Sequence, residues 1–232
     1  MTDFKHIYSH QADRYEALVA REDYAQNLPR ALDQICPWRG ADVIELGAGT
    51  GRVTMLYAPV ARSIHLFDAS RPMLDVAAAK LRRTNAVNWL ATVADNRQLP
   101  VSDGVADVSI AGWSFGHFTG WYPSTWRVEI ERAIEQLRRV LRPDGVMIII
   151  ETLGTGSESP QAPSDALAAY YQLLERDYGF SSTWIRMDFR FESSAEAAAL
   201  LGFFFGDELA DRVTRSGLTI FPECPGLWWR RR

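Results

Sequence analysis

The segment at residues 43–54 constrains the fold of this chain more than any other, because it joins an apolar run to a loop with three glycines. Its sequence is Val-Ile-Glu-Leu-Gly-Ala-Gly-Thr-Gly-Arg-Val-Thr. Glycine adopts positive φ without steric cost and lets another molecule approach the backbone closely. The N–H groups at the start of the following helix have no partner inside the helix and are available to a ligand. The segment therefore predicts a strand, a ligand-binding turn and a helix, the first unit of an open α/β sheet.

Four more apolar runs, each short enough to be one strand, recur along the chain. They lie at residues 63–67, 88–94, 106–111 and 146–150. Runs of this kind suit strands that are buried on both faces of a parallel sheet. Stretches of helical periodicity separate them, and alternating strands and helices predict a doubly wound sheet with right-handed crossovers.

Capping residues place two of the intervening helices. Ser70 is expected to cap a helix that has Pro72 in its first turn. The apolar face of this helix would comprise Met73, Leu74, Ala77, Ala78 and Leu81. Ser124 is expected to cap a second helix, in which Glu135 and Arg139 would pair on the exposed side. The buried stripe of the second helix would comprise Ile130, Ile134, Leu137 and Leu141. Residues 142–145 would then form a turn that ends the helix.

The two ends of the chain differ from this alternating middle part. Residues 10–35 have helical character, and a second helix is expected at about residues 164–177, after a loop rich in Gly, Ser and Pro. Residues 184–191 and 218–229 resemble strands, with a helical stretch at 193–215 between them. We expect this tail to close the sheet with an antiparallel edge pair and to belong to the same domain.

Composition narrows the class of protein. A chain of 232 residues with ordinary apolar and charged fractions predicts one globular domain. A net charge of −4 makes a phosphate backbone an unexpected partner. Cys36 and Cys224 have no metal-ligand spacing, so neither a metal site nor a disulfide framework is expected. Neither a secretory signal nor a run long enough to cross a bilayer is apparent, so we expect no membrane association and a cytoplasmic protein.

The spacing of the glycines distinguishes between two kinds of nucleotide site. Dinucleotide-binding turns use G-x-G-x-x-G, whereas here the glycines are Gly47, Gly49 and Gly51, and Arg52 stands where the third dinucleotide glycine belongs. Glu45 precedes the loop, and an anion there would repel a pyrophosphate. It would suit a ligand that carries an ammonium group and a sulfonium centre, so a nicotinamide oxidoreductase is the weaker alternative.

The motif E-L-G-x-G-x-G resembles motif I of the class I S-adenosylmethionine-dependent methyltransferases. The resemblance continues in order through residues 64–68, 93–96, 107–113 and 141–145, and it covers about residues 40–151. It implies a Rossmann-like, doubly wound, seven-stranded mixed sheet with helices on both faces. It also implies S-adenosylmethionine as the cofactor and methyl transfer as the reaction.

The resemblance divides the single domain into three parts. Residues 1–38 would form an N-terminal helical lid, and residues 40–151 the cofactor-binding core. Residues 152–232 would supply a substrate-side helix and the closing antiparallel strands.

The resemblance also assigns residues to the cofactor. These are Tyr15, Arg21, Glu45, Gly47, Ala48, Gly49, Thr50, Gly51, Asp68, Ala69, Ser70, Met73, Asp95, Asn96, Ala111, Gly112 and Trp113. Asp68 would accept the ribose hydroxyls and Asp95 the adenine amino group, although Asp68 also suits a helix cap and Asp95 a turn. Tyr15 and Arg21 would reach the methionine end, and their alternative is helix packing or solvent exposure.

His117 is the candidate catalytic residue. It follows the fourth strand, where the family places groups that face the substrate, and its unperturbed pKa suits a general base. The alternative is a loop histidine packed among aromatic rings. The aromatic residues at 113–126 would either line a pocket for an aromatic or cationic substrate or cover the core.

A small molecule is the expected methyl acceptor, and the segment after the fourth strand carries the argument. Residues 111–115 read Ala-Gly-Trp-Ser-Phe, without the Asn/Asp-Pro-Pro-Tyr/Phe motif of adenine or glutamine methylation. Methylation of RNA or protein is one alternative, and an S-adenosylmethionine-binding protein without catalysis is another. Nucleic acid is not an expected partner, and the sequence leaves the acceptor atom and the oligomeric state open.

Overall fold

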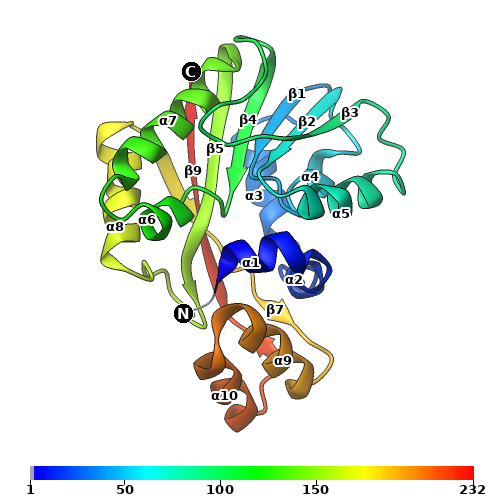
Figure 1. The fold of residues 1–232 in the computed structure, drawn as a ribbon, viewed down its shortest axis with the longest axis vertical. Helices are drawn as coiled ribbons and strands as arrows, with labels where there is room; N and C mark the ends of the chain where they lie inside the picture. Colours follow the sequence, from blue (N-terminus) through cyan, green and yellow to red (C-terminus); the bar gives the residue numbers. More distant parts are fainter. Residues whose placement is uncertain (1–2) are drawn as a thin grey trace.

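The computed structural model describes residues 3–232 and has a seven-stranded mixed sheet at its centre (Figure 1). The strands are β1 (Asp42–Leu46), β2 (Ser63–Asp68), β3 (Trp89–Val93), β4 (Ala106–Gly112), β5 (Leu141–Thr155), β6 (Ser181–Trp184), β7 (Phe189–Arg190), β8 (Ile220–Phe221) and β9 (Glu223–Arg231). Their order in the sheet is β3-β2-β1-β4-β5-β9-β6, with β7 and β8 paired separately. Strands β1 to β5 are parallel, and β9 is antiparallel to both β5 and β6. The predicted fold class and the antiparallel closing pair are confirmed.

Helices cover both faces of this sheet. They are α1 (Phe4–His10), α2 (Ala12–Val19), α3 (Asn27–Ile35), α4 (Thr54–Tyr57), α5 (Arg71–Leu81), α6 (His117–Trp121), α7 (Trp126–Arg139), α8 (Asp165–Gln172) with the π-helical turn η1 (Leu173–Asp177), α9 (Ser194–Phe205) and α10 (Asp207–Ser216). Successive side chains of a strand point to opposite faces. Val146 and Ile148 accordingly pack with α3, α4 and α5, and Met147 and Ile149 pack with α6, α7 and α8. The core is therefore divided into two layers by the sheet.

Helix α5 follows the sequence prediction closely. The Ser70 hydroxyl accepts a hydrogen bond from the N–H of Met73, and Pro72 lies in the first turn. All five residues that were predicted to form the apolar face are buried. Local capping and periodicity thus determine this helix.

Helix α7 differs from its prediction at both ends. Its N-cap is Thr125 rather than Ser124. Glu135 pairs with Arg138 at 2.9 Å, and Arg139 instead reaches Asp103 at 2.8 Å. One turn of helix separates residues three or four apart, so either spacing allows a pair.

The turn expected at residues 142–145 lies inside β5. Leu141 pairs with Ala106 and Val146 with Val108, so the longer strand bulges between these pairs. Arg142 fastens this bulge to the neighbouring strands, because its guanidinium binds Asp107 at 2.7 Å and Asp42 at 2.8 Å. The chain thus turns at these residues as the Pro-Asp-Gly sequence predicts, since Asp144 has a φ of 66°, but the turn is a bulge within β5 rather than a loop before it.

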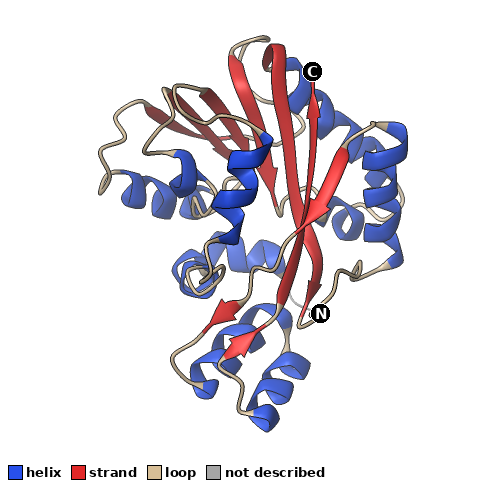
Figure 2. Ribbon diagram, turned by 180° about the vertical axis from the view of Figure 1, so that it is seen from behind, coloured by secondary structure: helices blue, strands red, loops and turns tan. Residues whose placement is uncertain are grey.

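The C-terminal part contains a lobe that the sequence did not predict. After β6 the chain leaves the sheet, forms β7, α9, α10 and β8, and returns as β9 (Figure 2). The lobe has a hydrophobic cluster of its own, which includes Phe189, Leu201, Val213 and Phe221. Leu18 of α2 completes this cluster. The strand expected at residues 184–191 is broken. Its first residue, Trp184, ends β6 in the main sheet, and Phe189 and Arg190 form β7 at the base of the lobe.

The N-terminal segment crosses the carboxyl edge of the sheet. The helical stretch predicted at residues 10–35 is broken into α2 and α3, because Asp23 and Gln26 adopt positive φ. Helices α1 and α2 lie between the sheet and the lobe (Figure 1). The Ser70 hydroxyl donates to the Tyr8 carbonyl at 2.6 Å, and Lys80 binds Glu16 at 2.6 Å, so both helices are fastened to α5. None of the helices within residues 3–232 has the length and apolar character that crossing a membrane requires.

Candidate active site

The glycine loop between β1 and α4 has a backbone that only glycine adopts easily. Gly47, Gly49 and Gly51 have φ angles of 65°, 55° and 78°. A Cβ on Gly47 would lie 2.4 Å from Cβ of Ser114, and one on Gly51 would lie 3.0 Å from Cβ of Ala77. A Cβ on Gly49 would have no neighbour closer than 3.7 Å. Packing therefore requires glycine at positions 47 and 51, whereas Gly49 borders less crowded space.

Asp68 lies at the end of β2 beside this loop. Its Oδ2 accepts a hydrogen bond from the N–H of Gly49 at 2.8 Å, and its Oδ1 accepts one from the N–H of Ser70 at 2.7 Å. Burial raises the pKa of the Asp68 carboxyl. Ser70, not Asp68, caps α5. Through its two hydrogen bonds Asp68 instead joins the glycine loop to the start of α5, and Ala69 lies between Asp68 and Ser70 in the chain. Each carboxylate oxygen retains a lone pair for another donor.

Three buried polar atoms around the glycine loop have no hydrogen-bond partner within residues 3–232. They are Oγ1 of Thr50, Nε of Arg52 and Oδ1 of Asn96. Asn96 lies against the loop, because its Nδ2 would be 3.1 Å from a Cβ on Gly47. A buried polar group without a partner costs about 1–3 kcal/mol. Such a concentration at one turn indicates a place where a polar ligand supplies the missing partners.

Two predicted cofactor ligands are already bonded inside the protein. Glu45 is 1% exposed and accepts hydrogen bonds from Thr54, at 2.6 Å, and from Tyr57. Burial raises the pKa of Glu45 to about 7. Asp95 accepts from the N–H and guanidinium of Arg97, which hold the pKa of this carboxyl below its usual range. Glu45 therefore braces α4 beneath the loop, and Asp95 forms the turn that was its alternative reading.

Arg21 does not reach the glycine loop either. Its guanidinium binds Glu196 at 2.6 Å and Glu192 at 3.2 Å, at the start of α9. The chain curves away after α2, so this side chain fastens the N-terminal segment to the lobe. The expectation that Arg21 pairs with a ligand carboxylate is therefore corrected.

Arg52, rather than Arg21, is the arginine beside the glycine loop. Its guanidinium lies over the ring of Trp113, 3.5 Å from the centroid, and binds both carboxylate oxygens of Glu22, at 2.5 and 3.1 Å. Trp113 follows Ala111 and Gly112 at the end of β4 and has a φ of 49°. Positive φ at a bulky residue is strained and often marks a functional site. The glycine loop, β4 and the N-terminal segment therefore meet at this arginine.

An aromatic cluster lies next to this point, between α1, α2, α6 and α9. Its members are Phe4, Tyr8, Tyr15, His117, Trp121 and Phe204. The Tyr8 hydroxyl lies 2.9 Å from Nε2 of His117, and Trp121 stacks on the imidazole at 4.8 Å. Burial lowers the pKa of His117 to about 4 and raises that of Tyr15 to about 12. His117 is thus both packed among rings and bonded to a tyrosine.

Glu151 is a carboxylate near this cluster. It follows the apolar residues of β5, is 4% exposed, and accepts a hydrogen bond from the N–H of Gly116 at 2.8 Å. Burial raises the pKa of Glu151 to about 8. Gly116 directly precedes His117, the first residue of α6, so Glu151 lies beneath the start of this helix.

Comparison with solved structures places this fold in a known group. The YcgJ protein of Bacillus subtilis superposes with a TM-score of 0.60 at 15% identity, over 90% of this chain and 99% of that one. An S-adenosylmethionine-dependent methyltransferase of Aquifex aeolicus superposes with a TM-score of 0.57 at 14% identity, over 95% and 98% of the two chains. A family model described as a methyltransferase domain matches residues 44–149, from β1 to β5. The chain thus shares its fold with S-adenosylmethionine-dependent methyltransferases, and its part from β1 to β5 matches a methyltransferase domain.

Curated methyltransferases with related sequences match only part of their length. An uncharacterized methyltransferase of Mycobacterium tuberculosis is 32% identical over 117 residues, which are 50% of this chain and 42% of the relative. A ubiquinone/menaquinone biosynthesis C-methyltransferase of Rubrivivax gelatinosus is 26% identical over 147 residues, which are 59% and 53% of the two chains. The chain thus spans about half the length of these methyltransferases.

The residues around the glycine loop fit S-adenosylmethionine, the cofactor that the likeness to these methyltransferases implies. Asp68 offers acceptors suited to hydroxyl groups, and Arg52 offers a cation suited to a carboxylate. The unpartnered hydroxyl of Thr50 lies in the loop between Gly49 and Arg52. The unpartnered amide oxygen belongs to Asn96, whose side chain lies beside Gly47. The donor set therefore matches a ligand with a ribose at one end and an amino acid at the other.

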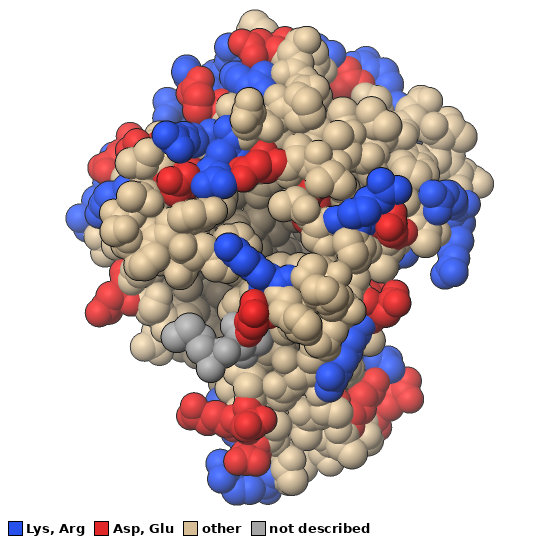
Figure 3. All heavy atoms as spheres, in the orientation of Figure 1, with Lys and Arg blue, Asp and Glu red and all other residues tan. Residues whose placement is uncertain are grey.

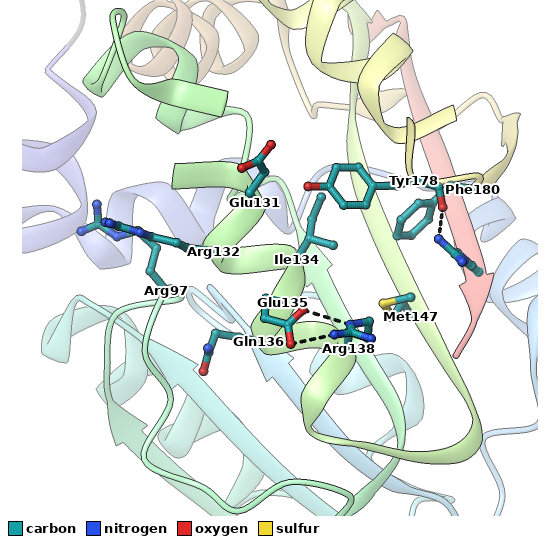
Figure 4. A pocket seen from close by; sticks show the side chains of 11 residues that line it. Arg97, Glu131, Arg132, Ile134, Glu135, Gln136, Arg138, Met147, Tyr178 and Phe180 are labelled. Carbon is teal, nitrogen blue, oxygen red and sulfur yellow. Dashed lines mark hydrogen bonds and ion pairs between the residues drawn. The ribbon is translucent and has the colours of Figure 1, made fainter. Parts of the chain in front are cut away.

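The surface of the protein is hollowed on this side. Figure 3 shows a depression above α1, at the carboxyl ends of the central strands in Figure 1. A separate cavity of about 420 Å³ lies beside α7, lined by Arg97, Ile134, Met147 and Phe180 among others (Figure 4). None of the predicted site residues lines that cavity. Within residues 3–232, no cluster of His, Cys, Asp and Glu is arranged to hold a metal.

Four residues of this candidate site were not predicted from the sequence. Arg52 and Glu151 carried a signal, since one follows the last glycine of the loop and the other directly follows an apolar run, as Asp68 does. Glu22 and Phe204 carried none, because their neighbours lie far away in the sequence.

Proposed function

We propose that this chain transfers the methyl group of S-adenosylmethionine to a small-molecule acceptor. The observation that carries the proposal is the set of unpartnered buried polar atoms around the glycine loop. Asp68 would accept the ribose hydroxyls, and Asn96 would contact the adenine. Met73, Ala48 and Ala69 would border the nucleoside, and Trp113 the methionine part.

The reaction asks little of the protein beyond alignment. The cofactor supplies a methyl group on a sulfonium, which is already a good leaving group. The chain holds the acceptor in line and keeps water out, and α1 and α2 are placed to exclude water because they cover this edge of the sheet. His117 would accept a hydrogen bond from the acceptor in exchange for the one from Tyr8.

A small acceptor is favoured by the cluster and by the surface charge. The rings of Tyr8, Tyr15 and Phe204 suit a flat or cationic molecule. On the face shown in Figure 3, the described Lys and Arg side chains are interspersed with Asp and Glu rather than forming a basic stripe. A nucleic-acid substrate would favour such a stripe.

The whole of residues 1–232 is proposed to act as one domain, and the cytoplasm as its compartment. The N-terminal helices contact the lobe through Leu18 and the start of α5 through Tyr8, which supports a single unit. Cys36 and Cys224 are buried, unpaired thiols, which suit a reducing compartment.

Calorimetric titration with S-adenosylmethionine and S-adenosylhomocysteine, with NAD as the control ligand, tests the cofactor site. Micromolar binding of the first two is expected. Asp68→Ala should weaken it at least about tenfold, which corresponds to about 1.4 kcal/mol, because the ribose hydroxyls lose a charged acceptor. Asp75→Ala removes an exposed carboxylate of α5 and should leave binding unchanged. A folded protein that binds neither ligand would contradict the proposal, and binding without any methylated product would favour a non-catalytic binding protein.

A further inference from the structure

Arg52 and Glu22 form an ion pair at the turn that would bind the cofactor. Arg52 directly follows the glycine loop, and Glu22 lies in the segment that joins α2 to α3. The two side chains are 18% and 4% exposed. The pair therefore links the N-terminal segment to the glycine loop inside the protein.

The surroundings of Glu22 do not favour a carboxylate there. Besides Arg52, the titratable groups that face it are Asp23 beside it in the chain, Glu223 of β9 and Tyr15 of α2. Three of these four neighbours are acids or a phenol, and Arg52 is the cation among them. Burial raises the pKa of Glu22 to about 8. A buried ion pair of this kind contributes little to stability, because desolvation offsets the attraction between the charges.

Arg52 has the properties of a carboxylate-binding residue. A guanidinium binds a carboxylate through two parallel hydrogen bonds. Glu22 accepts from both terminal nitrogens of Arg52, so a ligand carboxylate that takes this edge must displace Glu22. Its Nε is buried without a partner, and its face is held by Trp113. The side chain is thus fixed in position before any ligand carboxylate arrives.

We propose that Glu22 is an internal competitor for the carboxylate of the cofactor's amino-acid part, and that Arg52 is the partner for which both compete. This inference rests on the proposed function. Cofactor binding would displace Glu22 and release one of the ion pairs that hold the N-terminal segment against the core. Lys80 with Glu16 and the bond between Ser70 and the Tyr8 carbonyl would remain.

The competition depends on pH in a defined direction. Below about pH 8 Glu22 carries a proton and competes weakly for Arg52, whereas above it the carboxylate competes strongly. The affinity for ligands that contain the amino-acid carboxylate therefore falls as the pH rises through about 8. Ligands without that carboxylate do not share this dependence, and binding at alkaline pH takes up protons.

The test compares S-adenosylhomocysteine with 5′-methylthioadenosine, which has the same nucleoside thioether but no amino-acid part. Both are titrated by calorimetry at pH 6.5 and 9, in buffers of different ionisation enthalpy, into wild type and Glu22→Gln. Glu22→Gln should bind S-adenosylhomocysteine several-fold more tightly than wild type at pH 9, with less proton uptake than wild type; the uptake by the ligand's own amino group is common to both proteins. Binding of 5′-methylthioadenosine should be the same in both proteins.

Two further variants separate this role from a structural one. Glu16→Gln breaks the ion pair with Lys80 and leaves Arg52 untouched, so it should not change the preference between the two ligands. Arg52→Gln should weaken S-adenosylhomocysteine alone. Equal effects of Glu22→Gln on both ligands, or an unchanged pH dependence, would overturn the competition. Failure of wild type to bind either ligand would instead overturn the proposed function.

Discussion

At the scale of a residue, His117 shows how burial limits chemistry. Its pKa of about 4 keeps the imidazole uncharged above pH 5, so it is a weak base that is suited to orienting an acceptor. A neutral hydrogen bond contributes about 0.5–1.5 kcal/mol, so His117→Gln should lower kcat/KM by no more than about tenfold. The chemical shift of the imidazole should stay constant between pH 5 and 8 when followed by NMR. A titration centred near 6.5 would show that the ring is solvated and the assigned burial wrong.

At the scale of an element, Ser70 serves two helices at once. Its hydroxyl accepts from the N–H of Met73 to cap α5 and donates to the Tyr8 carbonyl to hold α1. Loss of a cap costs about 0.5–2 kcal/mol, and Ser70→Ala also loses the second bond. Ser164→Ala, which removes only the cap of α8, is the matched control. Urea unfolding should show a larger loss of stability for Ser70→Ala, and equal losses would mean that the bond to α1 contributes nothing.

At the scale of the whole molecule, buried carboxyl groups make the stability depend on pH. The pKa values of Glu22, Glu45 and Glu151 are raised to about 8, 7 and 8 by burial, whereas an unfolded chain has about 4.3. Between the unfolded and the folded pKa values, the folded protein therefore binds more protons than the unfolded chain. The free energy of unfolding consequently falls as the pH rises from about 4.5 to 8. Thermal unfolding should have a higher midpoint at pH 5.5 than at pH 8. Glu151→Gln should make the unfolding midpoint less dependent on pH, whereas the control Glu158→Gln, on an exposed loop, should not. The same pH dependence in wild type and both variants would contradict the raised pKa of Glu151.

The same scale shows what the sequence predicts and why the rest escapes it. The core from β1 to β5, with α5, follows from capping, periodicity and glycine spacing, which are local signals. The site depends on contacts between distant parts of the chain. Tyr8 meets His117 across 109 residues, and Glu22 meets Arg52 across 30. Periodicity carries no information on such pairs, so Arg21 was placed at the loop and Arg52 was not.

The lobe between β6 and β9 leaves and re-enters the main sheet through the paired strands β7 and β8. Its two ends are therefore close together, and the seven-stranded sheet closes without any of its residues. The lobe nevertheless places Phe204 against Tyr8 and Tyr15. Substitutions in the lobe can therefore change what faces the proposed acceptor without replacing any residue of the seven strands.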